Sequence, residues 1–345
     1  TTVSDLVAVG KNALYANTSG TGNTGLGYEA LTANTTGASN TAVGYTALDA
    51  NTTASNNTAV GYASLGANTT GANNDAFGRE ALLSNTTGAS NSAFGSTALD
   101  ANTTGSYTSA FGQAALGANT TASSNTAVGY AALTANTTGT QNTAVGSLAL
   151  DANTTVNYLT AFGYNALGAN TTGEKNTAIG RAALQSSTTV SENTAVGYNA
   201  LSGGSLAGGN NTAIGSSALS TLTTGTDNTA VGRNAVEATT SGTGNTGIGR
   251  EALASNTTAD NNTAVGYNAL LVNTTGAGNT AVGATALDAN TTGADNVAIG
   301  INALSANVSG NYQVAIGRNS LLNSNSPSGN VAVGYNTGQA ITTGD

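Results

Sequence analysis

The sequence predicts an all-β protein, a β-solenoid of the β-roll type with twenty 17-residue rungs. One repeat fills the chain: a segment such as "TAVG" ends in Gly every 17 residues from Gly10 to Gly197 and again from Gly215 to Gly334. Only the step from Gly197 to Gly215 is longer, at 18 residues. A fixed period of this size is the signature of stacked repeats, each of which buries its apolar side chains against its neighbours. Rung positions are counted below from this glycine, which is position 0.

The first element of each repeat is a short strand at positions −3 to −1. Position −3 is mostly Thr, position −2 is Ala or Gly, and position −1 is always apolar. Side chains alternate between the two faces of a strand, which predicts a bulky Thr/Val/Ile/Phe face and a flat Ala/Gly face. We expect both faces to be covered, with position −1 on the bulky face as the largest core position. All four phenylalanines occupy position −1 and are therefore predicted core residues: Phe77, Phe94, Phe111 and Phe162.

The rest of the repeat is predicted to turn back on itself. Leu stands at position +4 in eighteen copies, and Asn stands at position +7 in fourteen, usually in "ANTTG". Asn and Gly tolerate left-handed backbone, so this segment is where the chain reverses. Seventeen residues cannot hold two helices and their loops, but they can hold two or three short strands with tight turns.

Residues 1–345 are predicted to form a single repetitive rod. The length alone would allow two domains, but twenty copies leave no room for another fold. The one-residue insertion lies within residues 198–211.

One rung buries few apolar side chains for the backbone it must order. The flat Ala/Gly face would let another backbone approach closely. The sequence therefore predicts that the chain binds copies of itself as a parallel homotrimer. Uncapped solenoid ends would also allow end-to-end stacking into a filament.

Composition excludes several kinds of chemistry. The chain has no His, Cys, Met or Trp, so we expect no metal site, no cofactor and no enzymatic activity. The net charge of −9 argues against nucleic acid as a partner. No apolar run reaches the roughly 18 residues that membrane insertion requires.

Position +1 is the predicted ligand-binding stripe, because tyrosine and arginine combine a planar body with hydrogen-bonding tips that suit a cell-surface glycan. An equally simple interpretation is structural, with these side chains stacking on neighbouring rungs. The candidate residues are Tyr28, Tyr45, Tyr62, Arg79, Tyr130, Tyr164, Arg181, Tyr198, Arg233, Arg250, Tyr267, Arg318 and Tyr335, with Lys11 in the same column.

The "NTT" turns have three interpretations: structural stacking, N-glycosylation and ice binding. Every one of the fourteen Asn residues begins an N-x-[ST] sequon. Ordered Thr arrays can bind ice, although adjacent Thr residues in a strand point to opposite faces. The acidic residues Asp49, Asp100 and Asp151 recur every 51 residues, as do Gly66, Gly117 and Gly168. Their spacing along the solenoid is too wide for a paired acid/base site.

The motif "NTAVGYNAL…NTTG" resembles the repetitive shafts of bacteriophage tail fibres and related bacterial surface fibres. It is more distantly similar to the head repeats of trimeric autotransporter adhesins, through "NVAIG" at 296–300 and "NVAVG" at 330–334. The resemblance implies a structural or adhesive shaft segment, located outside the cell, on its surface or on a virion. The alternatives are a self-associating filament without a ligand and an ice-binding protein.

Overall fold

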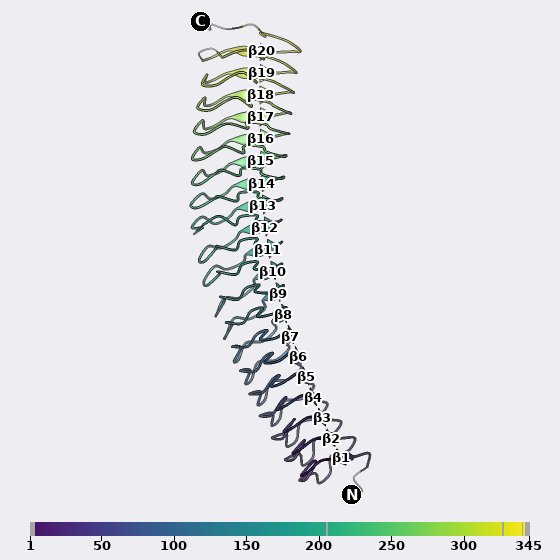
Figure 1. Cartoon of the computed structure of the whole chain (residues 1–345). Helices are drawn as coiled ribbons and strands as arrows, with labels where there is room; N and C mark the ends of the chain where they lie inside the picture. The colour runs from purple at the N-terminus through teal and green to yellow at the C-terminus, as the bar shows by residue number, and fades with distance from the viewer. Residues whose placement is uncertain (1–3, 205, 326–327, 340, 342–345) are drawn as a thin grey trace. The chain divides into compact units, whose positions relative to one another are not determined.

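The computed structural model describes residues 4–204, 206–325, 328–339 and 341. The chain divides into two compact units, Thr1–Glu174 and Lys175–Asp345. Each unit is a parallel β-solenoid of 17-residue rungs, with its strands stacked one above the next (Figure 1). The described residues contain strands and turns but no helix. The predicted fold class, an all-β solenoid, is confirmed for each unit.

Every rung contributes one three-residue strand at positions −3 to −1. The strands of the first unit are β1 (Val7–Val9), β2 (Thr24–Leu26), β3 (Thr41–Val43), β4 (Thr58–Val60), β5 (Asp75–Phe77), β6 (Ser92–Phe94), β7 (Ser109–Phe111), β8 (Thr126–Val128), β9 (Thr143–Val145) and β10 (Thr160–Phe162). Those of the second unit are β11 (Thr177–Ile179), β12 (Thr194–Val196), β13 (Thr212–Ile214), β14 (Thr229–Val231), β15 (Thr246–Ile248), β16 (Thr263–Val265), β17 (Thr280–Val282), β18 (Val297–Ile299), β19 (Val314–Ile316) and β20 (Val331–Val333).

Neighbouring strands pair in parallel, and each residue lies beside the same repeat position of the next rung. Thr41 pairs with Thr58, and Val43 pairs with Val60. The insertion does not disturb this register, because Thr194 of β12 pairs with Thr212 of β13 although they are 18 residues apart. The extra residue is absorbed in the turn between them, where Leu206 makes an isolated parallel bridge with Ser187.

The core lies on the alanine side of the strand only, so the prediction that position −1 is the largest core position is wrong. In the rung that begins at Thr41, Ala42, Ala47 and Leu48 are fully buried. Phe77, Phe111 and Phe162 are 36%, 40% and 41% exposed, and Phe94 is only partly buried. None of the four predicted core phenylalanines is a core residue of the chain itself.

The reason for the reversal is that leucine fills the interior. A methyl group placed on Gly25, at position −2 of β2, would lie 3.4 Å from Cγ of Leu14, the position +4 leucine of the preceding rung. The opposite wall of the solenoid is therefore so close to the strand that only Ala or Gly fits beneath it. The bulky side chains at positions −3 and −1 must then point outward.

The remaining walls of a rung are turns rather than the two or three strands expected. The backbone at positions +2, +4 and −5 is left-handed, as at Thr46 (φ 49°), Leu48 (φ 51°) and Asn56 (φ 60°). This conformation costs roughly 1–2 kcal/mol per residue other than glycine. It allows two consecutive side chains, Ala47 and Leu48, to point inward, which an extended strand forbids. Hydrogen bonds between rungs continue through these turns, for example from Leu48 N–H to the Ser64 carbonyl at 3.0 Å.

The glycine at position 0 is required by backbone geometry. Gly44 has a φ of +143°, and a Cβ there would lie 2.3 Å from the carbonyl oxygen of Gly61 in the next rung. No other residue fits this column without moving the stacked backbones apart, so the same glycine recurs in all twenty copies.

Two columns of buried asparagine complete the interior. At position +7, Asn51 Nδ2 donates to Asn34 Oδ1 at 2.8 Å and to the Ala54 carbonyl at 3.0 Å. At position −4, the Asn57 backbone N–H donates to Asn40 Oδ1 at 3.0 Å. Each side-chain amide thus binds a neighbouring rung, which satisfies polar groups that burial would otherwise penalise.

Candidate interaction surfaces

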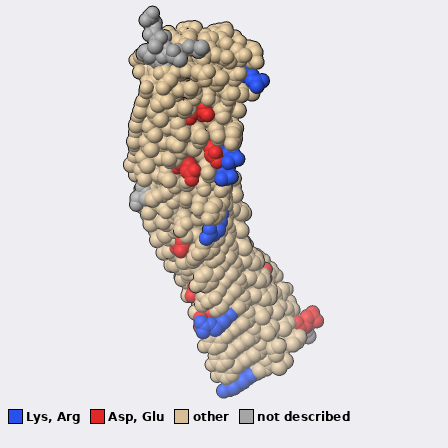
Figure 2. Space-filling model, turned by 45° about the horizontal axis from the view of Figure 1, so that its top comes forward, with Lys and Arg blue, Asp and Glu red and all other residues tan. Residues whose placement is uncertain are grey.

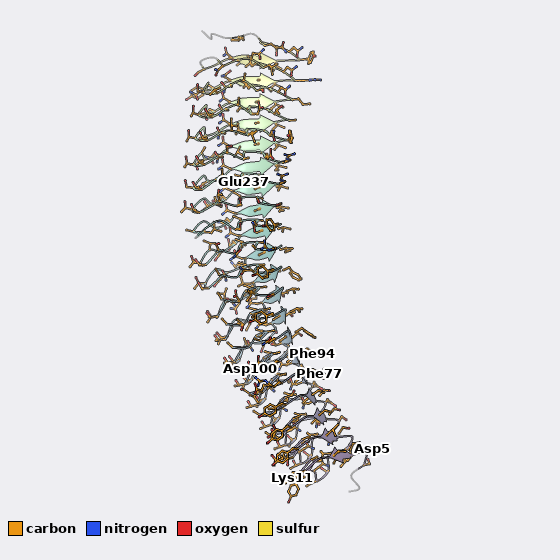
Figure 3. All side chains as sticks on the ribbon, viewed as in Figure 1. Asp5, Lys11, Phe77, Phe94, Asp100 and Glu237 are labelled. Carbon is orange, nitrogen blue, oxygen red and sulfur yellow. The ribbon has the colours of Figure 1, made fainter. Side chains whose placement is uncertain are left out.

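The strand-face stripe, defined here as the position −1 side chains of β1–β20, is a row of apolar side chains that runs along each unit. Its members that are at least 36% exposed include Val9, Leu26, Phe77, Phe111, Val128, Phe162, Ile179, Ile214, Ile248, Ile299 and Val333. Phe77, Phe94 and Phe111 stack on successive rungs with ring centroids 4.7 and 4.8 Å apart. Figure 3 labels Phe77 and Phe94 of this stack. Every rung therefore presents one large apolar side chain outward.

The position −3 side chains lie beside the strand-face stripe on the same side of the sheet. Most are half-buried threonines, such as Thr41 and Thr58. Asp75 also occupies this column and is exposed. Because a lone carboxylate is rarely buried, Asp75 was the signal in the sequence that this face points to solvent.

In the first unit, the candidate tyrosines Tyr28, Tyr45 and Tyr62 form a stacked ladder. Their ring centroids are 4.9 and 5.5 Å apart, and the planes are inclined by 9° and 6°. Lys11 Nζ lies 5.7 Å from the centroid of the Tyr28 ring. Arg79, in the rung after Tyr62, is paired with Glu80 at 3.0 Å. These contacts agree with the structural interpretation of position +1.

Outside this ladder, the position +1 residues are more separated. Tyr130 and Tyr164 are exposed and lie two rungs apart. In the second unit, Arg181 and Arg250 lie over the rings of Tyr198 and Tyr267, each at 5.5 Å. Arg250 also pairs with Glu251 at 3.0 Å. The remaining candidates, Arg233, Arg318 and Tyr335, are exposed in the same column.

This geometry limits what the column can bind. The faces of the Tyr45 ring are covered by Tyr28 and Tyr62, so a sugar cannot stack on them. The ring edges and the phenol and guanidinium tips remain accessible, since Tyr45 and Tyr62 are 50% and 52% exposed. Any ligand of this column would be held by hydrogen bonds to a row of tips. Figure 2 shows how sparse charged side chains are on the surface that it displays.

The Asn-Thr-Thr turns stack on one another, and their sequon asparagines are buried in the folded chain. Thirteen of the fourteen sequon asparagines, from Asn34 to Asn307, have no exposed surface. A glycan attached to Nδ2 would displace the ladder hydrogen bonds. The first threonine of most turns is also hydrogen-bonded to the next rung. Thr35 Oγ1 donates to the Thr52 carbonyl at 3.0 Å, and Thr18 Oγ1 donates to the Thr35 carbonyl at 2.9 Å. The hydroxyl row expected for ice binding is thus partly used within the chain.

The three periodic aspartates each lie against a glycine of the next rung. The Cβ site of Gly66 is 3.5 Å from Asp49 Oδ1, and that of Gly117 is 3.5 Å from Asp100 Oδ1. Asp151 has the same relation to Gly168, at 3.2 Å. Burial raises the pKa of the Asp49, Asp100 and Asp151 carboxyls, and hydrogen bonds from backbone N–H groups lower it in part. The aspartates and the glycines share the 51-residue period, and each aspartate lies next to one of these glycines in the following rung.

The described part of the chain holds no cluster of three or more carboxylates that would suit a metal ion, and no pocket opens on it. It also lacks any helix that could cross a membrane.

The fold and these surfaces define a parallel β-solenoid protein with an exposed apolar strand face. No family model matches the sequence, and comparison with curated proteins gives no significant match. The resemblance to fibre shafts therefore stays a prediction.

Proposed function

We propose that this chain is a shaft segment of an extracellular or virion fibre, in which parallel copies pack through their strand-face stripes. The observation that carries the proposal is that each rung turns a large apolar side chain outward, although smaller residues would serve a solvated surface. Continuous exposed apolar surface is typical of protein interfaces. The number of copies that we favour is three, arranged around a common axis with all chains in the same direction.

The strand face replaces the Ala/Gly face as the surface that meets the other copies. The position −2 alanines from β3 to β20 are buried inside their rungs and are not accessible to a partner. The position −1 column is expected to lie at the dry centre of the interface. The position −3 column contains the exposed carboxylate of Asp75, and it is expected at the hydrated rim of the interface.

Placing a charged side chain on the strand-face stripe tests this assembly. Phe94→Lys and Val128→Lys place a cation on the stripe of the first unit and are expected to convert trimers into monomers in sedimentation equilibrium at micromolar concentration. Thr87→Lys and Thr121→Lys, at exposed turn positions, are the matched controls and are expected to stay trimeric. Circular dichroism establishes that all four variants keep the solenoid. A wild-type protein that sediments as a monomer would overturn the proposal.

The adhesive role of the fibre would belong to the position +1 column. Repeated weak contacts along a multivalent shaft add up to high avidity even when each contact is weak. Glycan-array binding that is lost in Tyr45→Ala/Tyr62→Ala would support this role. Unchanged binding in that variant would remove the column as the ligand site and leave a purely structural shaft.

Ice binding is a second candidate, and the strand face is what favours it. The half-buried hydroxyls of Thr41 and Thr58 lie on the strand face and alternate with the methyl groups of Val43 and Val60. Rows of this kind repeat at the rung spacing of about 4.8 Å. Assembly through the strand face would cover these rows. Thermal hysteresis by a monomeric protein would therefore favour ice binding over the fibre.

A further inference from the structure

We propose that Tyr28, Tyr45 and Tyr62 form an oxidative cross-linking site, at which neighbouring rungs become joined by dityrosine bonds. The site is independent of the proposed assembly, because all three tyrosines belong to consecutive rungs of one unit. The oxidant is hydrogen peroxide, used by an external haem peroxidase.

The ladder holds its phenols in the arrangement that coupling requires. The centroid separations of 4.9 and 5.5 Å, with near-parallel planes, bring equivalent ring carbons of adjacent tyrosines next to one another. The rungs hold the backbones at a constant spacing, so the rings are already positioned next to each other before they react. Because Tyr45 and Tyr62 are half exposed, their rings are free to tilt towards each other.

Only this part of the column has consecutive tyrosines. Tyr130 is preceded by Gln113 and followed by Ser147 at position +1, so it has no phenol on either adjacent rung. Tyr198 and Tyr267 are preceded by Arg181 and Arg250. The same exposed residue type is thus present both with and without a neighbour, which gives the chain its own internal control.

Glu29 provides a proton acceptor beside the first phenol. A hydrogen bond with the Glu29 carboxylate raises the pKa of the Tyr28 hydroxyl, which keeps the phenol protonated. Asn12 Nδ2 lies 3.4 Å from Glu29 Oε1. Oxidation of Tyr28 can therefore pass its proton directly to a carboxylate as the electron leaves.

The reaction balances with one peroxide per bond. The peroxidase removes one electron from each of two neighbouring phenols, and the two phenolic protons pass to Glu29 or to water. Hydrogen peroxide takes up the two electrons, together with two protons from the water, to form two water molecules. The two tyrosyl radicals then form one carbon–carbon bond between their ortho carbons. Each of those carbons releases its hydrogen as a proton to the oxygen of its own ring, which restores both aromatic phenols.

The test treats the full chain with a haem peroxidase and hydrogen peroxide, then digests it with trypsin and with proteases that cut after Glu and before Asp. Cleavage after Glu29 and before Asp49 places Tyr28, Tyr45 and Tyr62 on separate peptides. We expect joined Tyr28–Tyr45 and Tyr45–Tyr62 peptides whose mass is lower by two hydrogen atoms than the sum of the parts, together with dityrosine fluorescence.

Tyr45→Phe is the critical variant, because phenylalanine keeps the stack but removes the central phenol. It is expected to abolish both joined peptides, whereas Tyr130→Phe should leave them unchanged. An equal mixture of nitrogen-15-labelled and unlabelled protein should give no mixed-label joined peptides. Joined peptides that persist in Tyr45→Phe, that carry mixed labels, or that involve Tyr130 as often as Tyr45 would overturn the proposal. So would the absence of any joined peptide in the wild type.

Discussion

At the residue scale, the thinness of the rung decides which side chains each position accepts. Two exceptions to the repeat illustrate this. Val236 is the one valine at position +4, and Gly247 is one of two glycines at position −2. A methyl group on Gly247 would lie 2.5 Å from Val236 Cγ2, whereas on Gly25 it would lie 3.4 Å from Leu14 Cγ. The branched valine therefore requires the glycine opposite it.

Gly247→Ala is expected to destabilise the second unit by about 1–3 kcal/mol through overpacking against Val236. Adding Val236→Leu should restore stability, because the pair then matches the other rungs. Chemical denaturation of the single and double variants measures this coupling, with Gly25→Ala as the control that should change stability little. Additive effects of Gly247→Ala and Val236→Leu would show that the two residues do not act on each other.

At the element scale, the asparagine column at position +7 acts as a ladder that joins the turns. In its centre, Asn85 Nδ2 donates to Asn68 Oδ1 at 2.9 Å and to the Gly88 carbonyl at 3.0 Å. Asn85 Oδ1 accepts from Asn102 Nδ2 at 2.8 Å. An oxygen in place of Nδ2 would face two acceptors in a buried site, which is costly.

Asn85→Asp is therefore expected to destabilise the first unit by roughly 3 kcal/mol at neutral pH. The loss should shrink in acid, because the protonated carboxyl can donate one hydrogen bond again. Thermal unfolding across the pH range checks this, and Asn56→Asp, on an exposed turn, is the matched control. Equal losses of stability for the two variants at neutral pH would show that the buried hydrogen bonds of the position +7 asparagines do not stabilise the fold.

The three aspartates that lie against glycines predict a second pH dependence. Their pKa is raised above the ordinary value of 3.8, so the folded protein binds these protons more tightly than the unfolded chain. Their contribution to stability is thus fully present below about that value and is lost as the pH rises through the folded pKa.

The variant Asp49→Asn/Asp100→Asn/Asp151→Asn should lack this component. Compared with the wild type, it is expected to gain less stability when the pH is lowered from neutral, which denaturant unfolding at several pH values measures. Identical pH profiles for the two proteins would show that these carboxyls are as well solvated when folded as when unfolded.

How far the sequence predicts the structure differs between positions. The period, the strand and the turn follow from Gly44, Ala42 and "NTTG", because the repeat imposes the same geometry on every copy. The inward face does not follow from alternation, since alternation marks two faces without saying which is buried. The left-handed backbone at Leu48 does not follow from the sequence either. Leucine has no preference for this conformation, which is held by packing and hydrogen bonds between neighbouring rungs.

At the scale of the whole molecule, the buried sequons restrict where the chain can fold. N-glycosylation of a sequon before folding would place a glycan on an asparagine that must be internal, such as Asn51 or Asn68. Folding and glycosylation are thus mutually exclusive at these sites.

Secretion through a glycosylating pathway is therefore expected to yield misfolded, glycosylated protein. Replacing the second threonine of the turns, such as Thr53 and Thr70, with alanine removes the sequons and keeps the buried asparagines. These replacements should restore folding and protease resistance, as should an inhibitor of glycosylation. Glycosylated protein that is as protease-resistant as the unmodified chain would contradict the buried ladder.

Cysteine substitution shows whether copies of the chain meet through the strand-face stripe, because the chain has no cysteine of its own. Val128 on the stripe is 38% exposed, and Thr121 lies on an exposed turn. In the native protein, Val128→Cys should resist alkylation and should form disulfides between copies on oxidation, whereas Thr121→Cys should be alkylated rapidly and stay uncross-linked. Rapid alkylation of Val128→Cys with no cross-link would show that the stripe faces solvent and that copies of the chain do not pack through it.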